Sequence, residues 1–286
     1  MSDIPQWFWD AVDQKPSAHA VAVDDADINY LSWSDDNALP GLMFVHGHNA
    51  HAHWWDFIAP GFSDNYHTVA LDLSGMGDSD HRDAYSADGY AGEILAVMDA
   101  AGLGPDTVVV AHSFGGIMGI KAAAMAPGRL KGLVLLDTGV KHPDDIRPRE
   151  PERVARAKVY PEFDIAKSRF RLQPPQQCDN PWIVEYIARH SIEHIDEGWV
   201  WKFDEEHSMR MQPVEGLEEA LTAVGCPMAL IYGELSESFS SKSAEYMKSL
   251  YPGLDVYELR DARHHLFLDQ PQAFMAQLKA ILDGWA

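Results

Sequence analysis

Val108-Val109-Val110-Ala111-His112-Ser113-Phe114-Gly115-Gly116 is the stretch that decides the expected fold of this chain. Its valines predict a buried strand, and Gly115-Gly116 opens a segment with helical spacing that runs to about residue 126. Ser113 stands at the turn between them, with a small residue two positions before it and another two positions after it, so the chain can pass close by without a side-chain clash. Such a turn projects the hydroxyl out of the sheet, and the helix N-terminus behind it favours negative charge. The stretch therefore predicts Ser113 as a nucleophile.

Short apolar strands alternate with helical segments on both sides of this stretch. Strands are expected at residues 42–45, 68–73, 107–111, 133–136, 228–232 and 256–259, and helices at 90–101 and after Pro271. Residues 20–23 and 28–33 flank an acidic turn and predict a hairpin. The alternation indicates an α/β fold with a mostly parallel central sheet and helices on both of its faces.

The alternation of expected strands and helices stops after Gly139, and the next expected strand begins at Met228. Residues 140–212 are charged and interrupted by prolines, and Arg149, Arg153 and Arg156 fall on one face of an expected helix. We therefore expect a core domain made of residues 1–139 and 213–286, with residues 140–212 inserted over the carboxyl edge of the sheet. In open α/β sheets ligands bind at that edge.

A serine nucleophile needs a base, because its own hydroxyl is a poor nucleophile at neutral pH. Among 14 histidines, His264 and His265 lie in a loop after the last expected strand. A base that comes after the serine and after the acid suits this kind of fold. His264 comes first after the strand and is the expected base, with His265 as a packed neighbour.

Composition limits the class of protein. The chain has 286 residues, a 46% hydrophobic content and a formal net charge of −22, which fit one large domain and disfavour binding to nucleic acid or anionic membrane. No apolar run approaches the ~18 residues of a membrane span, and residues 1–16 lack the pattern of a signal peptide. We expect a soluble cytoplasmic protein. Cys178 and Cys226 are expected to be reduced thiols, because neither has zinc-binding spacing.

Four stretches together resemble the α/β-hydrolase superfamily. They are His46-Gly47-His48, residues 72–79 (Asp-Leu-Ser-Gly-Met-Gly-Asp-Ser), residues 111–116 and residues 264–271, and they come in the family order. The resemblance implies an α/β-hydrolase fold in which residues 140–212 form a helical cap, or lid. It also implies an oxyanion hole made by the backbone N–H groups of His48 and Phe114.

The acid of the expected triad departs from the family pattern. In most relatives it lies three residues after the glycine that ends the strand, here Gly233, and that position holds Ser236. Glu237 follows one residue later, a placement that some relatives use with an aspartate. Asp137 is the rival, because it ends the strand after the nucleophile helix, where haloalkane dehalogenases carry their acid. We favour Glu237 slightly over Asp137, since the longer side chain could compensate for the shifted position.

The histidines after residue 45 suggest a competing zinc site. His46-x-His48-x-x-His51 has the spacing of a metallo-β-lactamase motif, but Ala50 stands where that motif needs an aspartate. We therefore expect no metal. His112, Trp54 and Trp55 are the expected substrate-binding residues, with core packing as the alternative for the tryptophans.

The resulting hypothesis is a serine hydrolase that cleaves a small ester-like substrate through an acyl-enzyme and needs no cofactor. A carboxylesterase is the preferred interpretation, and a lactonase, a carbon–carbon bond hydrolase or an acyltransferase could use the same triad. A non-catalytic ligand receptor on the same fold and a zinc-dependent hydrolase are the alternatives from other classes. The oligomeric state and the natural substrate cannot be read from the sequence.

Overall fold

The computed structural model describes residues 4–146 and 158–286. An eight-stranded sheet forms its centre, in the order β1-β2-β4-β3-β5-β6-β9-β10. β1 pairs antiparallel with β2, β2 pairs antiparallel with β4, and all remaining pairs are parallel. The predicted hairpin and the mostly parallel sheet are therefore confirmed.

The strands of the sheet are short. They are β1 (Ser17–Val23), β2 (Ala26–Ser32), β3 (Gly41–Val45), β4 (His67–Leu71), β5 (Val108–His112), β6 (Gly132–Leu136), β9 (Met228–Gly233) and β10 (Asp255–Leu259). Every residue of β3, β4, β5, β6 and β9 is buried. Burial on both faces explains why these strands read as continuous apolar runs in the sequence rather than as alternating patterns.

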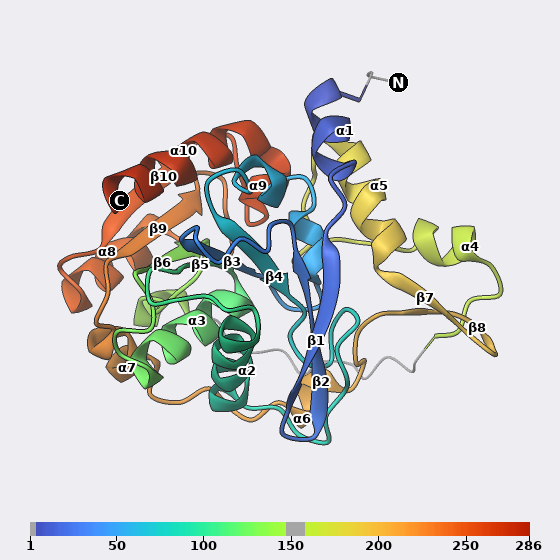
Figure 1. Ribbon diagram of the computed structural model, residues 1–286, viewed down its shortest axis with the longest axis horizontal. Coiled ribbons are helices and arrows are strands. Elements are labelled where there is room, and N and C mark those ends of the chain that lie inside the picture. The colour runs from blue at the N-terminus through green and yellow to red at the C-terminus, as the bar shows by residue number, and fades with distance from the viewer. Residues whose placement is uncertain (1–3, 147–157) are drawn as a thin grey trace.

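Helices cover both faces of the sheet (Figure 1). One face packs against α2 (Ala87–Ala100), α3 (Phe114–Met125), α7 (Leu217–Ala223) and α8 (Ser241–Leu250). The other packs against α1 (Gln6–Val12), α9 (Leu266–Asp269), α10 (Pro271–Gly284) and the 3₁₀ turns η1 (Ala52–Trp55) and η2 (Ala59–Gly61). The strand-to-helix alternation of the sequence thus becomes a three-layer core.

Among the described residues, the segment between β6 and α7 lies beside this core (Figure 1). Its described part holds η3 (Pro143–Asp145), α4 (Phe163–Ser168), α5 (Pro181–His190), β7 (Ile192–Ile195), β8 (Gly198–Trp201) and α6 (His207–Arg210). The antiparallel pair β7 and β8 is a hairpin that the sequence patterns did not reveal. The expected helical face with Arg149, Arg153 and Arg156 lies outside the described residues.

Two isolated β-bridges join this segment to the core. Met76 bridges to Phe203, and Tyr85 bridges to Met211. Among the helices of the described chain, none is long and apolar enough to span a bilayer.

Candidate active site

Ser113 occupies a strained turn between β5 and α3. Its backbone has φ 51° and ψ −119°, a region that residues with a Cβ rarely adopt. The turn brings α3 against the end of β3, where a Cβ on Gly115 would lie 2.3 Å from the carbonyl oxygen of His46. This contact is the physical reason for the glycine two positions after the serine. The strain holds the Ser113 hydroxyl at the carboxyl edge of the sheet.

His264 reaches Ser113 from a loop that follows β10. Its Nε2 lies 3.0 Å from the Ser113 Oγ, and its ring is almost fully buried. The loop can approach because β9 ends in a glycine. A Cβ on Gly233 would lie 2.4 Å from the carbonyl oxygen of Ala262 and 2.5 Å from that of Arg263. The geometry thus brings together the serine and the histidine that the sequence singled out.

The carboxylate beside His264 belongs to Asp137. Its Oδ2 lies 2.7 Å from His264 Nδ1, and the residue is buried immediately after β6. The carboxylate also accepts a hydrogen bond from the backbone N–H of Gly233 at 3.0 Å and one from the Ser236 hydroxyl at 2.6 Å. These two donors fix the position of the carboxylate, which can in turn orient the imidazole.

The preference for Glu237 is corrected by this geometry. Glu237 is exposed to solvent on the loop after β9, whereas Ser236, at the usual position of the acid, points at Asp137. The reason is topological: β6 and β9 are neighbours in the sheet, so their two ends deliver side chains to the same point. A serine in the acid position, read together with an aspartate ending β6, was the signal that could have found this arrangement.

Two further buried histidines surround His264. His112 and His265 have ring centroids 4.8 Å and 4.9 Å from that of His264. Burial, with repulsion from His264, lowers the pKa of His112 well below its usual value and lowers the pKa of His265 to about 3. Both rings are therefore neutral at neutral pH, and they add no charge that would oppose a proton on His264.

The neutral state of His265 predicts a pH-dependent stability. An unfolded histidine titrates near pH ~6.5, so between that pH and about 3 the unfolded chain binds a proton that the folded chain does not. The free energy of unfolding should therefore fall as the pH falls through this window. Between pH 7 and pH 5 the loss of stability from His265 is at most about 2 kcal/mol.

Urea unfolding at both pH values should show that His265→Leu loses less stability than wild type when the pH is lowered. Equal losses would contradict the prediction. Any packing energy lost through the substitution is the same at both pH values, so it does not affect this comparison.

The two groups expected to form an oxyanion hole lie on either side of the Ser113 turn. Phe114 is the first residue of α3, where backbone N–H groups have no intrahelical acceptor. His48 lies on the loop after β3, a strand adjacent to β5. His46 holds this loop, because its Nδ1 donates to the carbonyl of Gly47 at 2.7 Å and its Nε2 accepts from the N–H of Leu73 at 3.0 Å.

A histidine of the inserted segment contacts His48, and no pattern in the sequence predicted this contact. His207 is buried, and its Nδ1 lies 2.9 Å from His48 Nε2. Its Nε2 lies 2.7 Å from the Tyr90 hydroxyl, which donates to the carbonyl of Ser74 at 3.0 Å. Because Tyr90 uses its proton on Ser74, a neutral His207 donates to Tyr90 and accepts from His48. The chain of bonds fixes the ring of His48 from the side of α6.

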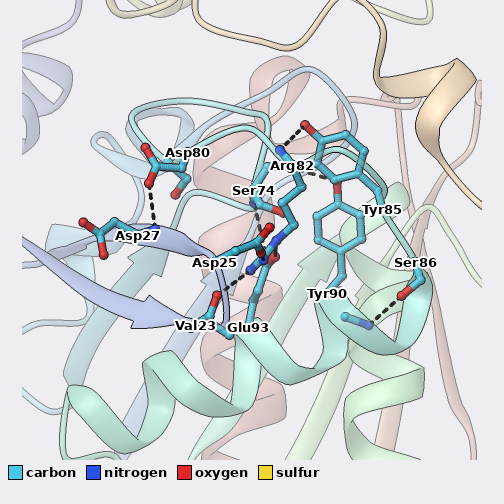
Figure 2. Close-up of polar contacts among 12 residues, drawn as sticks. Val23, Asp25, Asp27, Ser74, Asp80, Arg82, Tyr85, Ser86, Tyr90 and Glu93 are labelled. Atoms are coloured by element: carbon cyan, nitrogen blue, oxygen red, sulfur yellow. Dashed lines mark hydrogen bonds and ion pairs between the residues drawn. The ribbon is translucent and has the colours of Figure 1, made fainter.

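Figure 2 shows the polar and aromatic groups around Tyr90 and Ser74. The rings of Tyr85 and Tyr90 stack with centroids 5.8 Å apart. Glu93 accepts from the N–H of Ser74 at 2.9 Å and from Arg82 Nε at 3.0 Å. Burial raises the pKa of Glu93, and the Arg82 guanidinium opposes that shift. Tyr90, which bonds His207, is therefore tied through the Ser74 backbone to Glu93 and Arg82, and such a network resists displacement.

Loss of the His207 ring should weaken catalysis rather than substrate binding. If the His48 N–H contributes to an oxyanion hole, His207→Ala should lower kcat by about 10-fold or more and leave KM nearly unchanged, because oxyanion donors act in the transition state. Affinity for a trifluoromethyl ketone, which mimics the tetrahedral intermediate, should fall in parallel. His194→Ala, an exposed histidine of β7, is the matched control. A rise in KM alone would show that His207 acts on substrate binding instead.

Two small cavities open near the catalytic groups. One, of about 190 Å³, lies beside His48 and is lined mainly by aromatic and basic side chains: Trp54, Arg169, Phe170, Arg171, Trp201 and Phe203, with Asn49 and Gln173. The other, of about 280 Å³, is lined by His264, Arg263, Leu235, Glu237 and Ser238 and by residues 174–177. Both are formed jointly by the core and the inserted segment.

The expected substrate-binding residues separate in the structure. Trp54 lines the cavity beside His48. Trp55 is fully buried and packs on Phe44 and Phe267 with centroids 4.8 Å and 4.5 Å away, which places it in the hydrophobic core. His112 is also buried, and its Nε2 bonds the carbonyl of His264 at 3.0 Å. His112 therefore braces the loop that carries His264.

The loop histidines of the competing zinc motif point to different partners. His46 bonds Gly47 and Leu73, His48 bonds His207, and His51 bonds the Ser191 hydroxyl at 2.8 Å. Within the described ranges, no group of three ligand atoms close enough to share a metal contains any of these three histidines. Their arrangement does not match the zinc hydrolase motif.

Known proteins resemble this chain in sequence and in fold. The model of the alpha/beta hydrolase family matches residues 42–277. Esterase Rv0045c of Mycobacterium tuberculosis is 26% identical over 269 residues, which cover 90% of this chain and 86% of that protein. Pimeloyl-[acyl-carrier protein] methyl ester esterase of Neisseria meningitidis is 20% identical over 87% of this chain and 95% of its own length. The crystal structure of E-2-(acetamidomethylene)succinate hydrolase superposes with a TM-score of 0.77 at 19% identity, covering 94% of this chain and 99% of that one.

The chain belongs to the alpha/beta hydrolase family. The resemblance inferred from the sequence and the expected fold class are thereby confirmed.

Proposed function

We propose that this chain is a serine carboxylesterase acting on small-molecule esters. One observation carries the proposal: Ser113 Oγ, His264 and Asp137 are joined in series by contacts of 3.0 Å and 2.7 Å at the carboxyl edge of the sheet. That is the arrangement of nucleophile, base and orienting acid on which acyl transfer depends. The family membership and the relatives named as esterases support ester hydrolysis as the reaction.

The proposed mechanism follows from the positions of these groups. Ser113 Oγ attacks the ester carbonyl while His264 Nε2 takes its proton, and Asp137 stabilises the resulting imidazolium. The backbone N–H groups of Phe114 and His48 stabilise the negative oxygen of the tetrahedral intermediate. His264 then protonates the leaving alkoxide. Water, activated by the same histidine, cleaves the acyl-enzyme and releases the acid and free Ser113.

The domain division stays part of the proposal. Residues 1–139 and 213–286 supply Ser113, His264 and Asp137, whereas residues 140–212 supply side chains to both cavities. A cap of this kind would select substrates by shape without contributing to the chemistry. Cavities of about 190 and 280 Å³ favour short acyl and alcohol groups over long chains.

A panel of substrates tests the function. Purified wild type should hydrolyse short-chain aryl esters, and p-nitrophenol release should exceed that of a Ser113→Ala blank. Parallel assays with lactones, β-diketones and acyl acceptors distinguish lactonase, carbon–carbon hydrolase and acyltransferase activities. If no ester, lactone or diketone is turned over above the blank while ligands still bind, the chain acts as a receptor on the hydrolase fold.

Catalysis should not depend on a metal ion. Because Ser113 is the proposed nucleophile, exhaustive dialysis against EDTA should leave kcat/KM unchanged within about twofold. An organophosphonate should abolish activity and add its mass to the peptide that contains Ser113. Loss of activity with EDTA and its recovery with Zn²⁺ would instead favour the zinc-dependent hydrolase.

A further inference from the structure

A second cluster of chemically capable side chains lies away from Ser113, where η1 of the core meets α5 of the inserted segment. His53 belongs to η1, Asp56 is its C-terminal cap, and His190 is the last residue of α5. One potential ligand atom from each lies within 4.8 Å of the other two. The three groups come from parts of the sequence about 135 residues apart, so only the docking of α5 on the core assembles them.

The contacts within the cluster leave one carboxylate oxygen unsatisfied. Asp56 Oδ2 lies 2.9 Å from His53 Nδ1 and accepts from the Tyr186 hydroxyl at 2.6 Å. Asp56 is buried, and its Oδ1 has no hydrogen-bond partner among the described residues. A buried carboxylate oxygen without a donor is costly and calls for an explanation. A cation at this point would provide one.

The two imidazoles lie face to face at the edge of this carboxylate. The rings of His53 and His190 stack with centroids 4.2 Å apart and an interplanar angle of 29°. The side chain of His53 is 21% exposed, which gives an ion a path from solvent. A metal ion binds neutral imidazole and has to displace the proton of a protonated one.

We propose that His53, Asp56 and His190 bind one divalent transition-metal ion of the zinc class and thereby fasten α5 to the core. Two imidazoles and a carboxylate suit Zn²⁺, Co²⁺ or Ni²⁺, whereas Ca²⁺ and Mg²⁺ prefer oxygen ligands alone. On binding, the ion takes the lone pairs of both rings and a lone pair of Asp56, and any proton held by His53 goes to solvent. Tyr186, already bonded to Asp56, orients the carboxylate as an outer partner. Water completes the coordination.

The site is separate from the proposed catalytic groups. In the part of the chain that the structure describes, His112, His264 and His265 form the other cluster whose ligand atoms lie within 4.8 Å of one another, and an ion there would occupy the base of the proposed triad. Metal binding at the two clusters would differ in its effect on catalytic activity. An ion held by His53 and His190 is compatible with an intact His264, so its binding does not require inhibition.

Titration of Co²⁺ into the full-length protein tests the proposal. Wild type should bind one Co²⁺ saturably, with the visible absorption of a low-coordinate nitrogen and oxygen site. His190→Ala and His53→Ala should each weaken binding by about 100-fold or more, since even outer partners of a metal are worth up to that much. Zn²⁺ should raise the melting temperature of wild type and leave that of His190→Ala unchanged, because only a ligand of the folded state stabilises it.

Matched variants decide between the outcomes. His194→Ala, an exposed histidine of β7, and Ser113→Ala should bind Co²⁺ as wild type does. Circular dichroism of the metal-free variants checks folding, and His190→Gln replaces His190→Ala if the latter does not fold. The proposal is overturned if wild type shows no saturable binding, or if binding survives the loss of His190. It is equally overturned if His265→Leu, rather than His190→Ala, removes the ion.

Discussion

Replacing Ser113 by alanine is expected to lower kcat/KM for the best ester of the panel by about 10⁴-fold or more, because it deletes the nucleophile. The change removes one oxygen at a half-buried turn, so packing changes little. Initial rates with wild type and variant at equal protein concentrations, measured by absorbance, provide the measurement. Retained activity would remove Ser113 from the mechanism and end the serine hydrolase proposal.

A glycine at the same position separates catalysis from folding. Ser113 has a φ of 51°, which glycine adopts without strain and alanine does not. Ser113→Gly should therefore be as inactive as Ser113→Ala, yet it should unfold at a higher denaturant concentration than the alanine variant. An inactive but more stable protein would show that the strained turn serves the chemistry at a cost in stability.

Asparagine at position 137 should have the second largest effect. Asp137→Asn keeps the shape of the side chain but removes the charge that stabilises a protonated His264, and it can leave the imidazole in the wrong tautomer. A loss of about 10⁴-fold in kcat is expected, with KM little changed. Asparagine tolerates positive φ, and Asp137 has a φ of 50°, so the variant should remain folded.

Glu237→Gln is the matched control for this experiment. Glu237 is exposed to solvent, and His264 Nδ1 bonds Asp137 instead, so the kcat of Glu237→Gln should stay within about threefold of wild type. This control removes the same charge from a side chain that does not face His264. A silent Asp137→Asn together with an inactive Glu237→Gln would restore the original preference for Glu237. If neither change matters, another group orients His264 and the proposed triad is wrong.

Much of the core could be predicted from the sequence, because the signals involved are local. Residues 108–116 carry their own strand, turn and helix, and the buried strands are marked by apolar runs that both faces of a parallel sheet require. The order of the signature stretches then implied the family. The β7–β8 hairpin was missed because it is short, and none of the four residues of β8 is fully buried, so it lacks a strong period of two.

The sequence by itself determined which serine and which histidine meet, because both stand on turns whose local patterns define them. Only the tertiary structure decided the rest of the site. Asp137 rather than Glu237 lies beside His264 because β6 and β9 are neighbours in the sheet. A neighbour relationship between strands about 90 residues apart leaves no trace in local periodicity. His207 and His190 likewise reach His48 and His53 only because the inserted segment folds back onto the core. Such contacts depend on how packed elements dock, and residue type and spacing along one segment do not encode them.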